Sequence, residues 1–152
     1  MQNHSLTELV PILQLAIGPV ILISGVGMLL LTFTNRFGRV VDRTRGLVRE
    51  LAAGPEAAHA GLLRAQAEIL TRRASILRLS ITLAAVAALL AGVLILLLFL
   101  GVLLELRVAG AVVLVFAAAV AALIGSILAF IRDLNLALAA LRIDLRLAPA
   151  GR

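Results

Sequence analysis

The residues of this chain that could do chemistry are few and far apart. An enzyme site needs a nucleophile beside a base, or a cluster of metal ligands. The chain has 2 histidines and no cysteine, and its first long apolar run separates His4 from His59. Glu56 and His59 are one helical turn apart, which supplies too few ligands for a zinc site. Because the sequence also lacks a glycine-rich phosphate loop, we expect no enzyme, no cofactor and no metal.

The charged residues with an informative spacing follow the first apolar run. Arg36, Arg39 and Arg43 fall along one side of a helix, and Asp42 is within helical reach of Arg39. Asp133 follows the third apolar run at nearly the same depth. We therefore expect an ion pair from Arg39 or Arg36 to Asp133 that joins the first and third helices. The alternative is that each charge is solvated among lipid headgroups.

Arg73 is a special case, because it falls with Gln66 in the middle of a broad apolar stripe. An unpaired charge in such surroundings is costly. We expect its guanidinium to snorkel to the polar surface, or to meet an acid such as Asp42 or a lipid phosphate.

Three runs without a charged residue define the elements that carry these side chains. They cover residues 9–35, 79–104 and 108–131, with 27, 26 and 24 positions, and an α-helix needs about 20 residues to cross the bilayer core. Only 14% of the residues are charged, against roughly 25% in a soluble domain. The prediction is one all-α membrane domain over residues 1–152, with three transmembrane helices at about these positions.

The arginines predict how the chain is oriented. Segment 36–78 holds nine of the 14 basic residues and the tail 132–152 holds four, whereas the link Glu105–Arg107 holds one and the N-terminus none. Since cytoplasmic loops carry the excess of basic residues, we expect segment 36–78 and the C-terminus in the cytoplasm and the N-terminus outside. The membrane then explains the net charge of +6 through anionic headgroups, without a nucleic-acid partner.

Beyond the membrane the helices are expected to continue. An apolar stripe extends the first span as an amphipathic helix to about residue 52, and Ala53-Gly54-Pro55 ends it with Gly54 as the C-cap residue. A second helix begins at about Glu56, so that 36–78 forms a cytoplasmic helical hairpin. This helix carries two seven-residue apolar series, typical of a coiled-coil seam: Leu62, Ile69 and Ile76, and Leu63, Leu70 and Leu77.

A tail helix is expected over about residues 132–148, with apolar stripes on two opposite sides. One stripe comprises Leu134, Leu138, Leu141 and Leu145, and the other comprises Leu136, Ile143 and Leu147. A helix that is exposed to water on one side needs only one apolar stripe. The tail therefore lies either between its own hairpin and a second subunit, which Leu136, Ile143 and Leu147 would contact, or between the two arms of its own hairpin.

Small residues recur every four positions in the second and third spans, which lets helices approach closely. The expected packing residues are Ala84, Ala88 and Gly92, with Ala118, Ala122 and Ser126 or alternatively Ala117, Ala121 and Gly125. In the first span, Gly18 and Pro19 predict a kink, because proline removes a backbone hydrogen bond. A broken helix can line an ion path, although a single kink is also common in helices with no transport role.

Residues 35–45 read Asn-Arg-Phe-Gly-Arg-Val-Val-Asp-Arg-Thr-Arg, after an apolar run that contains Ile-Gly-Pro-Val-Ile-Leu-Ile-Ser-Gly. Together with Arg-Asp-Leu-Asn-Leu at 132–136, this pattern resembles a family of small bacterial membrane proteins classified only as a domain of unknown function. The resemblance covers most of the chain, and it implies a three-span protein of the bacterial inner membrane. It implies no activity.

Two functions fit these observations. The favoured one is a structural, accessory or assembly component that associates with itself or with a larger membrane complex. The alternative is an oligomeric channel for small ions, with the kinked first span lining the pore and the arginines favouring anions. The spans contain no ionisable residue, which argues against proton-coupled transport.

Overall fold

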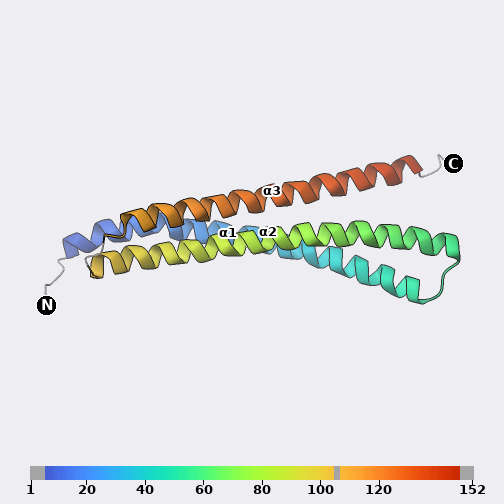
Figure 1. Cartoon of the computed structure of the whole chain (residues 1–152), viewed down its shortest axis with the longest axis horizontal. Coiled ribbons are helices and arrows are strands. Elements are labelled where there is room, and N and C mark those ends of the chain that lie inside the picture. Colours follow the sequence, from blue (N-terminus) through green and yellow to red (C-terminus); the bar gives the residue numbers. More distant parts are fainter. Residues whose placement is uncertain (1–5, 105–106, 148–152) are drawn as a thin grey trace. The chain divides into compact units, whose positions relative to one another are not determined.

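The computed structural model describes residues 6–104 and 107–147, and this part of the chain contains helices and no strand. The three helices are α1 (Leu6–Ala52), α2 (Ala57–Leu103) and α3 (Ala109–Leu147) (Figure 1). Each of them is long and apolar enough to cross a membrane. The predicted fold class, an all-α protein with three candidate transmembrane helices, is confirmed.

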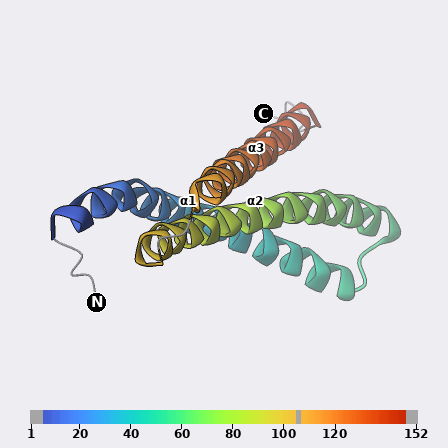
Figure 2. The same cartoon turned by 60° about the vertical axis from the view of Figure 1, so that its left-hand side comes forward.

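α1 continues without interruption beyond the first uncharged run. It has 47 residues and contains Pro11 and Pro19 in its interior. The blue part of α1 is bent in Figure 2, as a helix that lacks a proline N–H is expected to be. Gly18 and Pro19 therefore lie within one helix and do not separate two half-helices.

The turn between α1 and α2 lies where the sequence predicts it. The amide of Ala53 donates to the carbonyls of Arg49 and Glu50, and the amide of Gly54 donates to that of Leu51. Gly54 has a φ of 75°, a left-handed conformation that glycine adopts without a steric penalty. The prediction that the first helix ends at about residue 52, with glycine as the cap, is confirmed.

The contacts of the chain fall into two compact units. The first unit comprises Met1–Leu31 and Thr82–Gly125, and the second comprises Thr32–Ile81 and Ser126–Arg152. All three helices contribute a segment to each unit.

In the first unit, small side chains occupy the most buried positions of α2. Ala84, Ala87 and Ala91 have no exposed surface. Ala88 and Gly92 are only half-buried, and a Cβ built on Gly92 meets no atom within 4 Å. Close packing therefore does use small residues, as predicted. After Ala84, however, the buried residues are Ala87 and Ala91 and not the predicted Ala88 and Gly92. Their spacing is three and then four residues, so the buried face is offset from the predicted four-residue series.

One glycine of the first unit is required by the packing. A Cβ built on Gly101 would overlap the Cγ2 atom of Val108. Gly101 itself is buried. Gly101, near the end of α2, and Val108, just before α3, can approach this closely only because Gly101 has no side chain.

In the second unit, the buried residues of α1 and α3 recur every seven positions, whereas those of α2 are spaced by 14 and three positions. The buried positions are Phe33, Val40 and Leu47 on α1, Leu63, Leu77 and Ser80 on α2, and Ser126 and Asp133 on α3. Of the two apolar series predicted on α2, only that of Leu63 and Leu77 is buried, whereas Leu62 and Ile69 are exposed. Within one chain the series through Ile69 is therefore not a buried seam, because a helix with a broad apolar stripe presents only one line of that stripe to its neighbours.

The tail helix is described in part. Leu134 and Leu136 are half-buried, and Leu138 is exposed. The side chains of Leu141, Ile143, Leu145 and Leu147 lie outside the described part of the chain. The predicted contact stripe of Leu136, Ile143 and Leu147 therefore remains a prediction.

Candidate functional site

The centre of the candidate site is a buried aspartate that receives two arginines. Asp133, on α3, has no exposed surface. Arg36 of α1 donates from Nε to its Oδ2 atom at 2.8 Å, and Arg73 of α2 donates from Nε to its Oδ1 atom at 3.1 Å. Each carboxylate oxygen is thus bonded from a different helix, and one side chain connects all three helices of the second unit.

Aromatic side chains lie one helical turn before two of these charged residues. The ring centroids of Phe33 and Phe130 are 4.5 Å apart with the rings tilted by 32°, and the Cζ atom of Arg36 is 5.7 Å from the centroid of Phe130. Such a contact between a guanidinium and an aromatic face is favourable. It adds a second contact, besides the one with Asp133, that holds Arg36 in position.

A second hydrogen bond between α2 and α3 lies on the same face as Asp133. The hydroxyl of Ser126 donates to the carbonyl of Ser80 at 2.8 Å, and both serines are fully buried. Ser80 in turn donates to the carbonyl of Ile76. Among the described residues, no buried side-chain nitrogen or oxygen lacks a hydrogen-bond partner.

This arrangement satisfies the requirements for a buried charge. An isolated carboxylate in an apolar interior is strongly disfavoured, whereas one that accepts hydrogen bonds from cations is tolerated. Two arginines against one aspartate leave a net charge of +1 on the cluster. Because both carboxylate oxygens are already bonded to arginine, Asp133 acts here as a connector between helices and is poorly placed to serve as a general base.

The structure brings together only part of the predicted basic cluster. Arg36, Arg73 and Asp133 form the connected centre described above. Arg39 and Arg43 are exposed, and the Nε atom of Arg39 is at 3.5 Å from the carbonyl of Asn35. Asp42, which the sequence predicts as a partner of Arg39 or Arg73, is also exposed and lies outside this centre.

The four arginines of the predicted cluster line a pocket of about 270 Å³. It is lined by Arg36, Arg39, Val40 and Arg43 from α1 and by Leu70 and Arg73 from α2. Two of its arginines are therefore tied to Asp133, and the other two are exposed.

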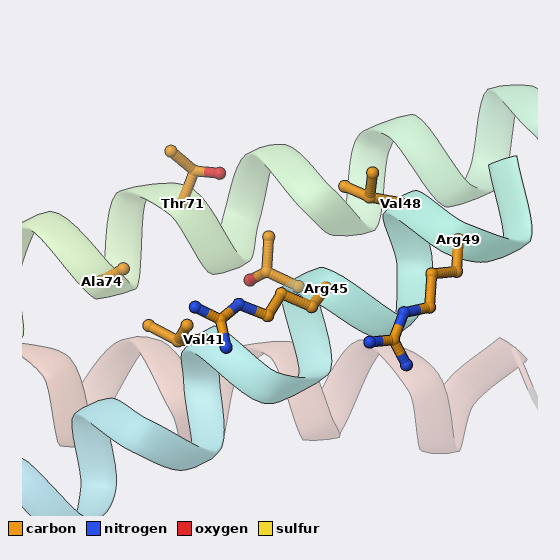
Figure 3. A pocket seen from close by; sticks show the side chains of 7 residues that line it. Val41, Arg45, Val48, Arg49, Thr71 and Ala74 are labelled. Carbon is orange, nitrogen blue, oxygen red and sulfur yellow. The ribbon is translucent and has the colours of Figure 1, made fainter. Parts of the chain in front are cut away.

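A second pocket of about 370 Å³ lies between α1 and α2, nearer to the turn. Arg45 and Arg49 extend from successive turns of α1, and Thr71 and Ala74 line the pocket from α2 (Figure 3). Val41 and Val48 complete its lining together with Thr44. This pocket combines an apolar wall with positive charge, but it contains no acid or histidine that could act as a base.

The first unit contains a pocket of about 540 Å³ beside Pro19. Its lining comprises Leu15, Gly18, Pro19, Ile21, Leu22, Leu94, Leu98, Val112, Phe116 and Val120. None of these side chains offers a hydrogen bond to an ion. The region of the predicted kink is therefore apolar, and Ser24 directs its hydroxyl to the carbonyl of Val20 on its own helix.

The histidine at the turn has a different neighbour from the one its sequence position suggests. His59 Nε2 lies 3.2 Å from Oε1 of Glu50, across the turn between α1 and α2, and both side chains are about half exposed. Within the described residues, no three groups of His, Cys, Asp or Glu are close enough to hold a metal.

Sequence reasoning missed the two contacts that flank Asp133, those of Phe33 with Phe130 and of Ser126 with Ser80. A usable signal exists for the first contact. Phe33 precedes Arg36 by three residues, and Phe130 precedes Asp133 by the same interval. On a helix, residues three apart share a face, so an ion pair between Arg36 and Asp133 places the two rings together.

The chain has three helices that are long and apolar enough to cross a membrane, and a buried charge cluster joins their segments in the second unit. These features define a small helical membrane protein. Residues 16–143 match the family described as "Protein of unknown function (DUF2721)", and the chain belongs to this family. The expected resemblance to a family of unknown function is confirmed. No curated protein and no solved structure matches the chain.

Proposed function

We propose that this protein is a non-catalytic, multi-pass membrane protein with a structural or assembly role, which associates with itself or with a larger membrane complex. The observation that supports this proposal is the state of Asp133. The most buried charged group of the described chain is used to hold three helices together. Such a use favours a rigid framework over a reactive site.

Exposed apolar side chains outside the uncharged runs support association. Val48 on α1 and Leu62 and Ile69 on α2 are each about half exposed or more. All three lie in the segment 36–78, which the arginine count places outside the bilayer. Leu62 and Ile69 are seven residues apart and therefore share one face of α2, and apolar side chains that share a water-facing surface are typical of a contact with another protein.

The proposed location is the cytoplasmic membrane of a bacterium, with the N-terminus outside and the C-terminus in the cytoplasm. Three membrane crossings place the two termini on opposite sides. The excess of arginine in 36–78 and in the tail favours the cytoplasm for these two segments.

The alternative function, an ion channel lined by the kinked part of α1, gains no support from the pocket beside Pro19. An ion that leaves water needs polar atoms to replace its hydration shell, and the side chains that line this pocket are apolar. An ion path would have to be formed at a contact between subunits.

The decisive experiment is native mass spectrometry of the purified protein in mild detergent. We expect a complex of two or more chains, or one that contains a second protein. Changing Leu62 and Ile69 together to glutamate should reduce this association, because two apolar contacts are replaced by charges. The matched control changes Thr71 and Ser75 to glutamate, since both are exposed on the opposite side of the same helix.

A protein that stays monomeric over a wide concentration range, without a co-purifying partner, would refute the assembly role. Equal dissociation of the two double variants would show that added negative charge acts in general and that the Leu62–Ile69 surface has no special part. Chloride flux in liposomes that contain the parent protein would instead support the channel.

A further inference from the structure

The pocket that contains four arginines has the composition of an anion site. Arg36, Arg39 and Arg43 line it from α1, and Arg73 lines it from α2. Asp133 compensates one of these four charges, so the group has an excess of three positive charges. Arginine is the side chain best suited to hold a phosphate, because its planar guanidinium can donate two parallel hydrogen bonds.

Asp133 holds two of these guanidinium groups in position without using all of their donors. Arg36 and Arg73 each bind the carboxylate through Nε, and a guanidinium carries four further N–H donors on its two Nη atoms. Their side chains are only 26% and 16% exposed. Two partly buried, oriented guanidinium groups thus retain free N–H groups, and little entropy is lost when they bind a ligand.

The position of the pocket along the helices identifies the source of the phosphate. Arg36 is the first charged residue after the uncharged run 9–35. Seven residues separate it from Arg43, roughly 10 Å along a helix. The headgroup layer beyond the hydrocarbon core is about 5–8 Å thick on each side. The pocket therefore coincides with the level at which lipid phosphates lie.

The pocket also has an apolar component. Val40 and Leu70 line it beside the arginines. Leu70 is only half-buried, whereas Val40 is buried. A free phosphate ion gains nothing from the exposed part of Leu70, whereas the glycerol and the first carbons of a lipid chain can cover it. The combination of cations and apolar side chains favours a lipid over a soluble ion.

We infer that Arg36, Arg39, Arg43 and Arg73 form a binding site for the phosphate group of an anionic phospholipid. Arg36 and Arg73 form its fixed base, oriented by Asp133, and Arg39 and Arg43 close around the phosphate from the exposed side. The site goes beyond the assembly role proposed above, because binding of one lipid to one chain does not require a second subunit.

The test measures retention of phosphatidylglycerol by the full chain in detergent, with native mass spectrometry as the readout. We expect one lipid to bind each chain in preference to phosphatidylcholine. Changing Arg39 and Arg43 together to glutamine should weaken phosphatidylglycerol binding about tenfold or more, equivalent to about 1.4 kcal/mol or more. These two residues do not contact Asp133, so the helices should remain packed, which a thermal unfolding curve will check.

The matched control changes Arg64 and Arg72 to glutamine, because both are exposed residues of α2 outside the pocket. It removes the same charge and should leave binding nearly unchanged. An equal loss of binding in both double variants would refute the site and leave only diffuse attraction to the basic surface.

Inorganic phosphate separates the two possible sources of the anion. An excess of inorganic phosphate should displace phosphatidylglycerol only weakly, since it lacks the apolar part. If it displaces the lipid fully and itself binds with one ion per chain, the site belongs to a free anion and the lipid assignment is wrong.

Discussion

Arg73 donates from its Nε atom to the Oδ1 atom of Asp133 at 3.1 Å, although the two residues are 60 positions apart in the chain. This contact explains how an arginine can occupy an apolar stripe of α2. The sequence suggested snorkelling, an acid such as Asp42, or a lipid phosphate as alternatives. The partner is an acid, but one carried by α3.

The first prediction concerns the cost of removing this acid. Changing Asp133 to alanine leaves Arg36 and Arg73 partly buried without their partner, and loss of one member of a buried ion pair costs about 3–5 kcal/mol. We expect a reduction in the free energy of unfolding at the lower end of this range, because both arginines keep some exposure. Thermal unfolding in detergent will measure it.

The control for this prediction removes the whole cluster. A triple variant with Asp133→Leu, Arg36→Met and Arg73→Met should be more stable than Asp133→Ala alone, since no charge is left buried without a partner. If Asp133→Ala unfolds at the same temperature as the parent, the carboxylate does not hold the helices together.

The second prediction concerns two glycines of α2. Changing Gly101 to alanine should destabilise the fold by about 1–3 kcal/mol, the usual cost of overpacking, because the new Cβ would overlap Val108. Changing Gly92 to alanine should be neutral or stabilising by up to about 1 kcal/mol, since a Cβ there meets nothing and alanine is the better helix former. Thermal unfolding of both variants under identical conditions checks the contrast. Equal effects would contradict the observed packing of Gly101.

The third prediction distinguishes the two apolar series on α2. Leu63 is 4% exposed and Ile69 is 48% exposed. Leu63→Asp should therefore cost a few kcal/mol, as burial of an unpaired charge does, whereas Ile69→Asp should cost much less. A chemical or thermal unfolding curve of each variant gives the comparison. A larger loss with Ile69→Asp would mean that this residue is covered by another subunit.

The fourth prediction concerns the turn between α1 and α2. Gly54 has a φ of 75°, and a side chain in this left-handed conformation costs roughly 1–2 kcal/mol. Gly54→Ala should lower the free energy of unfolding by about this amount. Gly61→Ala is the control, because Gly61 lies inside α2 with open space around it and the change should stabilise the helix slightly. If Gly54→Ala is as stable as the parent, the turn relaxes into another conformation.

The structure follows from the sequence wherever one local feature is sufficient to decide it. The uncharged runs are long enough to require helices, and Ala53-Gly54-Pro55 combines a left-handed cap with a proline that cannot continue the helix. These features act within one segment of chain. The number of helices and the end of α1 therefore follow from the residues themselves.

The partners of individual side chains could not be predicted in the same way. Whether Arg36 or Arg39 meets Asp133 depends on the rotation of α1 about its own axis and on its position along α3, and a shift of one turn exchanges the two arginines. Within the uncharged runs the difficulty is greater, because nearly every residue is apolar. Ala91 and Gly92 are equally suited to a close contact by size, and only the packed helices show that Ala91 is the buried one.

The last prediction concerns the orientation of the chain. Three helices that each cross the bilayer put the two termini on opposite sides, and 13 of the 14 arginines fall in segments 36–78 and 132–152. Because basic residues are retained on the cytoplasmic side, a fluorescent reporter fused after Arg152 or inserted at Gly54 should be active in the cytoplasm. An export-dependent phosphatase should be active when fused before Gln2 and inactive at the other two positions. The two reporters control for each other, since each is active on only one side of the membrane. Cytoplasmic signals from both termini would mean that one of the three helices does not cross, and an external C-terminus would overturn the orientation inferred from the arginines.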